Sequence, residues 1–486
     1  MTSCLALDFG ASGIRLIDVA LEGERLAWTE LARFPNGPQL IDGRLVWDYD
    51  TIFGQTKAAL RAAGNSGVRY ASIGAASWGV DYVLLGERGE LLGAPVSYRD
   101  SRTNGQIEHY VAKHLSAQQL FSMTGIQCLS FNTLYQLYAQ SRNEPDLLRR
   151  TRRLLLTADY VHYWLSGKAA NERTLASTSQ MLTLDGRWSP EILRTLALPA
   201  DALAEPVRPG TVLGPIRAEL ETGLREIAVT APAAHDTESA ILAVPAVGDP
   251  DWAYLSSGTW SIIGVESKTP FCGAAAYAAG FSNECGYDNT YCVQSTVTGL
   301  WLIQEIQRLL GGSVEIGSLA AEAEKAPAFR SLVNPADARF FNPGNMIEEI
   351  RAACREAGEP EPESSAQLAR CAYDSLALLY RAAMRELSAV TGRRFTRLHV
   401  VGGGSRATLL NRLCAATTGI PVYAGPAEAT ALGNALAQFH ALGTLTSVAQ
   451  ARRLIHESFP PVLFEPVPLP GLENAIGRFE RLKAPQ

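Results

Sequence analysis

Small residues lie between two charged ones near the start of the sequence, where Asp8 is followed by Phe-Gly-Ala-Ser-Gly-Ile and then Arg15. The apolar run before Asp8 predicts a strand, and the Gly-Ala-Ser-Gly stretch predicts a turn into a second strand. Backbone amides and a hydroxyl in such a turn can hold a phosphate, while the carboxylate can order Mg²⁺ through water. The alternative interpretation is a hairpin that uses glycine and serine for turn geometry alone.

A second turn of this kind, Ser-Ser-Gly-Thr at residues 256–259, lies between two more apolar runs in the second half of the chain. The repeated pattern of strand, small-residue turn and strand predicts an internal duplication. Two such turns can bind the phosphates of one nucleotide. Residues 402–404 are three glycines between an apolar strand and a periodic helix, which is a further place for a nucleotide. Triple glycine that serves only helix packing is the alternative.

The sequence His235-Asp236-Thr237 lies between an apolar strand and another apolar run. A carboxylate at such a junction can accept a proton from a substrate hydroxyl. The alternative interpretation is that His235 and Asp236 only cap the next helix.

Strands that alternate with helices position these residues, so the sequence predicts a mixed α/β architecture. Asp50 is the expected cap of a helix that ends at Gly64, and Ser364 or Ser365 is the expected cap of a long amphipathic helix through Leu387. A break at residues 245–250 predicts a domain boundary. The expected division is an N-terminal domain at 1–244, a C-terminal domain at 250–450 and a tail at 451–486 whose placement the sequence leaves open.

The chain has 486 residues, of which 47% are hydrophobic and 19% charged, and its formal net charge is −6. This composition excludes a disordered chain, and the lack of a basic surplus argues against nucleic acid as the main partner. No apolar stretch approaches the roughly 20 residues of a spanning helix, and the N-terminus has no basic leader, so we expect a cytoplasmic protein without a membrane partner. The scattered cysteines indicate buried thiols rather than a metal site, and Cys354 and Cys371 are expected to stay reduced.

Seven segments, taken together and in order, resemble the sugar kinases of the FGGY type, within the actin-like and hexokinase-like ATPases. These segments are residues 77–81, 98–103, 131–137, 235–237, 254–260, 299–302 and 428–434. The similarity runs from Leu5 to about Asn434. It implies two ribonuclease-H-like domains flanking a catalytic cleft, with ATP and Mg²⁺ on one side and a sugar deeper in.

The resemblance also implies roles for individual residues. Asp236 is similar to the general base that takes the proton from the sugar hydroxyl, and Asp8 is similar to the carboxylate that organises Mg²⁺ through water. The implied sugar contacts are Gly79, His235, Asp236, Thr237 and Thr296. The implied nucleotide contacts are Ala11, Ser12, Gly13, Ile14, Arg15, Thr259, Gln304 and Gly402.

Two features of the sequence depart from the family pattern. Gly13 and Ile14 stand where the family's phosphate loop has a second Ser or Thr and then Gly, and Thr296 stands where an Asn that contacts the sugar is usual. The segments are most similar to those of kinases that phosphorylate L-rhamnulose at carbon 1. A kinase for another ketose, such as L-fuculose or a xylulose-like pentulose, and a sugar-binding regulator without turnover are the alternatives. The sequence does not indicate an oligomeric state.

Overall fold

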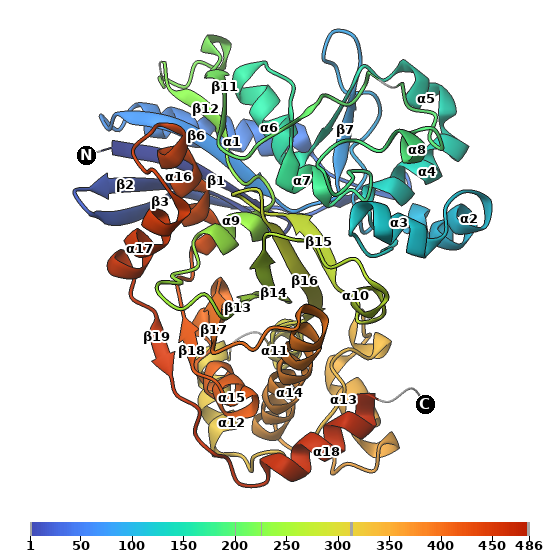
Figure 1. The fold of residues 1–486 in the computed structure, drawn as a ribbon, viewed down its shortest axis with the longest axis vertical. Helices are drawn as coiled ribbons and strands as arrows, with labels where there is room; N and C mark the ends of the chain where they lie inside the picture. Colours follow the sequence, from blue (N-terminus) through green and yellow to red (C-terminus); the bar gives the residue numbers. More distant parts are fainter. Residues whose placement is uncertain (1, 200, 225, 312–313, 484–486) are drawn as a thin grey trace. The chain divides into compact units, whose positions relative to one another are not determined.

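The computed structural model describes residues 2–199, 201–224, 226–311 and 314–483, in which strands alternate with helices (Figure 1). The chain forms two compact units. The first unit comprises Met1–Ala243, Glu266–Val293 and Ala429–Ser458. The second unit comprises Val244–Val265, Gln294–Glu428 and Phe459–Gln486. Residues 250–450, expected as one domain, therefore contribute to both units, because two stretches of this range pack with the first.

A six-stranded sheet with the strand order β11-β12-β6-β1-β2-β3 is the centre of the first unit. Its strands are β1 (Thr2–Gly10), β2 (Gly13–Glu22), β3 (Arg25–Pro35), β6 (Tyr70–Ser77), β11 (Thr211–Pro215) and β12 (Ala228–Ala231). β1 and β2 form the predicted antiparallel hairpin, while β6 runs parallel to β1. Alternate residues of β1, namely Leu5, Leu7 and Phe9, are buried in the main core of this unit.

Helices pack on this sheet and extend the unit. They are α1 (Tyr49–Gly64), α2 (Gln106–Lys113), α3 (Ala117–Thr124), α4 (Thr133–Asn143), α5 (Pro145–Arg150), α6 (Thr157–Ser166), α7 (Arg173–Ser177), α8 (Pro190–Leu193), α9 (Asp236–Leu242), α10 (Ala274–Ala278), α16 (Ala429–Ala441) and α17 (Val448–Ser458), with the 3-10 helices η1 (Ser101–Thr103) and η2 (Ala218–Leu220). The expected cap of α1 is wrong by two positions. The Asp48 carboxylate accepts from the Thr51 amide, because α1 begins at Tyr49, two residues earlier than a cap at Asp50 requires, and Asp50 lies inside its first turn.

Short strands complete the first unit. They are β4 (Gln39–Ile41), β5 (Arg44–Val46), β7 (Tyr82–Leu85), β8 (Arg153–Leu156), β9 (Asn171–Glu172), β10 (Pro206–Val207) and β15 (Ser282–Cys285). α16 packs on β1 and β6 (Figure 1), where the Asn434 amide donates to the carbonyls of Leu7 and Gly74, and Gln438 donates to Leu5. A segment far along the chain therefore completes the burial of the first strand.

The second unit repeats the strand arrangement of the first. Its neighbouring strands follow the order β16-β14-β13-β17-β18-β19. They are β13 (Trp252–Ser257), β14 (Trp260–Ser267), β16 (Tyr291–Thr298), β17 (Arg397–Val401), β18 (Val422–Ala424) and β19 (Val462–Phe464). The antiparallel hairpin β13–β14, the parallel neighbours β17 and β18 and the antiparallel edge β19 match β1–β2, β6, β12 and β11 in order and direction. The predicted duplication is confirmed.

The helices of the second unit include the long one that the sequence predicts. They are α11 (Trp301–Leu309), α12 (Ile316–Lys325), α13 (Met346–Glu356), α14 (Ser365–Thr391), α15 (Thr408–Thr418) and α18 (Leu472–Lys483), with η3 (Ala338–Phe340) and η4 (Gly403–Arg406). Ser364 caps α14 through its side chain. Cys354 and Cys371 are buried free thiols on α13 and α14. Within the described residues, no helix combines the length and the apolarity that crossing a bilayer would require.

Candidate active site

The β1–β2 turn holds the first predicted group. Asp8 and Arg15 lie directly opposite each other in the hairpin, and Arg15 Nε donates to Asp8 Oδ2 at 3.1 Å. Their side chains are only 12% and 18% exposed, so the ion pair is largely shielded from water. The turn itself is held by Asn36, whose amide nitrogen donates to the Ser12 carbonyl and whose side chain donates to the Gly10 carbonyl.

The tip of this turn is open, whereas its second half is in the core. Ser12 is exposed and Ala11 and Gly13 are half-buried, but the Ile14 side chain is fully buried. Gly10 is required at the start of the turn, because a Cβ there would lie 2.7 Å from the Gly13 carbonyl oxygen. What the turn can offer a phosphate is therefore backbone amides and the Ser12 hydroxyl, while the side chain of Ile14 offers no donor.

The His235–Thr237 segment begins α9. His235 is the residue before the helix, but its side chain makes no capping hydrogen bond. Asp236 is the first helical residue, and its Oδ1 accepts from the Thr237 amide at 2.7 Å. The Asp236 side chain remains 31% exposed. His235 therefore occupies the N-cap position without capping α9 through its side chain, and the Asp236 carboxylate remains partly exposed.

Burial, neighbouring charges and two hydrogen bonds from Thr237, which lower the pKa, act on the Asp236 carboxyl. Burial raises its pKa, His235 lowers it because its Nε2 lies 3.5 Å from Asp236 Oδ1, and the Asp8 carboxylate raises it. The net pKa lies above the usual value for an aspartate. A carboxylate with a raised pKa holds a proton more readily, which suits a general base.

Gly79 lies in the loop after β6, close to the same segment. Ser77 pairs with His235, and its amide donates to the Ala234 carbonyl at 2.8 Å. A Cβ on Gly79 would lie 2.9 Å from the Thr178 side chain, so the loop closes tightly there. The structure thus brings the Gly79 loop beside His235 within the first unit.

The second unit holds its own group around the β13–β14 turn. Thr259 is exposed at this turn, and its carbonyl accepts from the Trp301 amide at 3.2 Å. A Cβ on Gly299 would lie 2.6 Å from the Gly258 carbonyl oxygen, so the start of α11 packs directly on the turn. Gln304 follows in the first turn of α11 and is partly exposed.

The glycine turn packs on the same strand end. Gly402 has φ +81°, and a Cβ there would lie 3.0 Å from the Ser257 carbonyl oxygen. A Cβ on Gly404 would overlap the Ser257 hydroxyl. The predicted nucleotide contacts Thr259, Gln304 and Gly402 therefore gather around one turn. Thr296 lies exposed on β16 of the same unit.

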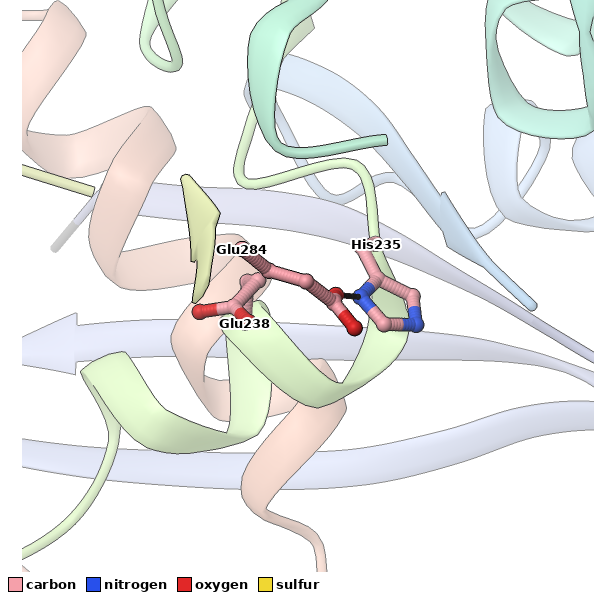
Figure 2. Close-up of side chains that lie close together, drawn as sticks. All are labelled: His235, Glu238 and Glu284. Atoms are coloured by element: carbon pink, nitrogen blue, oxygen red, sulfur yellow. Dashed lines mark ion pairs between the residues drawn. The ribbon is translucent and has the colours of Figure 1, made fainter. Parts of the chain in front are cut away.

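Sequence reasoning missed an acidic pair behind His235. Glu284 on β15 forms an ion pair with His235 Nδ1 at 2.8 Å, and Glu238 of α9 lies beside them (Figure 2). Single atoms of the three side chains lie within 4.8 Å of one another, a set that can bind a metal ion. Here His235 Nδ1 is engaged by Glu284, and Cys292 Sγ donates to Glu238 at 2.6 Å. In the sequence, Glu284 is a single acidic residue in the short segment Ser-Asn-Glu-Cys, and nothing else there indicates its role.

Comparisons with known proteins identify the family to which the chain belongs. The N-terminal domain of the FGGY family of carbohydrate kinases matches residues 3–243, and the C-terminal domain of that family matches residues 253–442. A protein of Yersinia pestis (strain Pestoides F) named rhamnulokinase is 43% identical over 459 residues, 94% of this chain and 93% of that protein. A rhamnulokinase of Pectobacterium atrosepticum is 42% identical over 485 residues, 99% of this chain and 97% of that protein.

Solved structures share the fold. A ligand-bound xylulose kinase of Lactobacillus acidophilus superimposes with a TM-score of 0.82 at 18% identity, over 99% of this chain and 97% of that one. Plasmodium falciparum glycerol kinase with ADP gives a TM-score of 0.80 at 14% identity, over 100% and 99%. The chain belongs to the FGGY family of carbohydrate kinases. It is therefore an ATP-dependent sugar kinase with the predicted two-domain α/β fold, and its small-molecule partners are a sugar and ATP.

Proposed function

We propose that this kinase phosphorylates L-rhamnulose on its primary hydroxyl at carbon 1. The observation that carries the choice of sugar is the identity of 42–43% to proteins named rhamnulokinase over 94–99% of the chain. An ATP-dependent kinase needs the nucleotide pool of the cytoplasm, which supports that location. As functional domains we propose residues 1–244 and 250–450 with a tail at 451–486, and the family matches to residues 3–243 and 253–442 support this division.

In the mechanism that we propose, Asp236 is the general base. The sugar hydroxyl gives its proton to the Asp236 carboxylate as its oxygen bonds to the γ-phosphorus of ATP, and ADP leaves with the electrons of the broken phosphorus–oxygen bond. His235, Thr237 and Gly79 are the proposed sugar contacts in the first unit, because His235 and Thr237 flank Asp236 and the end of the strand before Gly79 pairs with His235. Thr296 is the proposed sugar contact in the second.

The proposed nucleotide contacts come from both small-residue turns. In the first unit they are Ala11, Ser12, Gly13, Ile14 and Arg15. In the second unit they are Thr259, Gln304 and Gly402. Support comes from the open tip of the β1–β2 turn and from the packing of Gly402 and α11 on the β13–β14 turn.

Asp8 is the residue that we propose to organise Mg²⁺. A carboxylate oxygen is a fitting Mg²⁺ ligand, but the ion pair with Arg15 offsets the charge of Asp8, which favours contact through water over direct coordination. Mg²⁺, when bound, offsets charge on the phosphates. The ion pair between Asp8 and Arg15 holds the Asp8 carboxylate in place at the base of the phosphate turn.

Gly13→Ser should restore the second hydroxyl of the phosphate loop. A Cβ at Gly13 would lie 3.6 Å from the Phe34 carbonyl oxygen, an ordinary contact, so serine fits without strain. We expect the KM for ATP to fall by about 2- to 10-fold with kcat little changed, the effect of one added hydrogen bond. Steady-state kinetics with varied ATP measure this. Gly13→Ala is the matched control, and an equal KM in the two variants would contradict the phosphate contact.

The sugar assignment is tested by a panel of ketoses in a coupled assay of ADP release. L-Rhamnulose should give the highest kcat/KM. A higher kcat/KM for L-fuculose or xylulose would instead assign that sugar as the substrate. Thr296 favours this second outcome, because its short hydroxyl reaches less far than an asparagine amide. Absence of turnover with every sugar, despite sugar binding, would support a regulator. Thr296→Asn should change the KM for the sugar and leave the KM for ATP as the internal control.

A further inference from the structure

A chain of three charged side chains runs through the proposed base. Glu284 Oε2 lies 2.8 Å from His235 Nδ1, and on the other side of the ring His235 Nε2 lies 3.5 Å from Asp236 Oδ1 (Figure 2 shows the Glu284–His235 pair). His235 is 8% exposed, and the Glu284 side chain is 16% exposed. Because both ring nitrogens face carboxylates, the ring orientation is set by Glu284 at one end and presented to Asp236 at the other.

We propose that Glu284 is a positioning residue for phosphoryl transfer, which holds the His235 ring with Nε2 toward Asp236 and keeps that ring positively charged. The inference rests on the proposed role of Asp236 as the base. Glu284 contacts His235, and its effect on Asp236 passes through the imidazolium.

The charge of His235 follows from its neighbours. Burial alone lowers the pKa of His235, but Glu284, Asp236 and Glu238 raise it, with the net result that the pKa is about 9. His235 is therefore a cation at neutral pH. A cation 3.5 Å from Asp236 favours the ionised carboxylate, against the burial and the Asp8 charge that raise the pKa of Asp236.

Glu284, rather than Glu238, is the counter-ion. Glu238 is 1% exposed and accepts from the Cys292 thiol at 2.6 Å. Burial, followed by the nearby Glu284 carboxylate, raises the pKa of Glu238 well above its usual value. Among the carboxylates that raise the pKa of His235, Glu284 has the largest effect, so we assign it as the counter-ion.

Other charged groups around α9 have partners of their own. Asp8 on β1 is paired with Arg15, and Arg452 on α17, which donates to the Ile241 carbonyl near the end of α9, is paired with Glu266. Glu172, on β9, accepts from the Ala234 amide and from Thr174. Because these groups have partners of their own, the Glu284–His235 ion pair is the interaction that sets the charge next to Asp236.

Glu284→Gln is the test, with kcat and kcat/KM measured in the full chain across the acid limb of the pH profile. Loss of the Glu284 charge should lower the pKa of His235, so that a larger fraction of the ring is neutral and the pKa of Asp236 rises. The acid limb should therefore move to higher pH by about one unit, with a roughly tenfold loss of kcat on that limb and little loss at alkaline pH, where Asp236 is ionised in both proteins. An unmoved limb, or an equal loss at every pH, would overturn the proposal.

Three further variants separate positioning from structure. Glu284→Asp retains the charge and should recover most of the shift. Glu359→Gln removes a similarly shielded glutamate, paired with Arg478 in the second unit, and should lower thermal stability without moving the limb. In a His235→Asn background, Glu284→Gln should cause no additional shift, and a further shift would contradict transmission through His235. Full activity in Asp236→Asn would contradict the proposed role of Asp236 as the base. If Asp236→Asn loses activity but the acid limb of Glu284→Gln does not move, only the proposed role of Glu284 is contradicted.

Discussion

Asp236→Asn should lower kcat by about 10²- to 10⁴-fold while leaving nucleotide affinity unchanged, because the amide cannot accept the hydroxyl proton. Asparagine has the same shape and can still accept from the Thr237 amide, so the start of α9 should be retained. Steady-state kinetics and a separate measurement of nucleotide binding give the two quantities.

Asp288→Asn is the matched control for this variant. Asp288 is 62% exposed and pairs with Lys268, away from α9 along the chain, so its replacement should leave kcat at the wild-type level. Equal rates in Asp236→Asn and wild type would remove Asp236 from the mechanism. Loss of nucleotide affinity together with kcat would instead indicate a disrupted first unit.

The second large effect is expected from Gly433→Ala. Gly433 of α16 lies against α9, where an added Cβ would overlap the Ser239 carbonyl oxygen and lie 2.6 Å from its carbon. Backbone cannot rotate away as a side chain can, so we expect the free energy of unfolding to fall by about 3 kcal/mol, the upper part of the range for overpacking. Because α9 carries Asp236, kcat should fall as well. Thermal unfolding and ADP release measure the two losses.

Gly54→Ala controls for the substitution itself. Gly54 is an exposed position in α1, and a Cβ there has no neighbour within 4 Å. Alanine in a helix interior should therefore stabilise the chain by about 0.5–1 kcal/mol. The contact between α9 and α16 would be in error if the two alanine variants had similar melting temperatures.

Local patterns in the sequence predict much of this fold. The two hairpins, the long helix α14 with its Ser364 cap and the strand before the glycine turn follow from turn residues, apolar runs and helical spacing. The cap of α1 was misplaced because Asp48 and Asp50 are both acceptable caps, and only the amide that each reaches decides between them.

Contacts between distant segments could not be predicted in this way. No periodicity in α16 indicates that Asn434 and Gln438 donate to carbonyls of β1. Likewise Glu284 is one acidic residue in a short strand, and its importance depends on the ring of His235, which lies 49 positions earlier in the chain (284 − 235). The motifs therefore include the residues that we propose to contact the substrate, whereas Glu284, which we propose to position His235, belongs to no motif.

The packing of α16 on β1 also determines when the first unit can fold during translation. A ribosome releases β1 and β6 long before it translates Asn434 and Gln438, whose amides occupy the carbonyls of Leu5, Leu7 and Gly74. During synthesis this face of the nascent sheet is uncovered, and those carbonyls have only water in place of the later amides. The first unit consequently reaches its native form after translation has passed α16, so the first half of the gene does not encode the complete first unit.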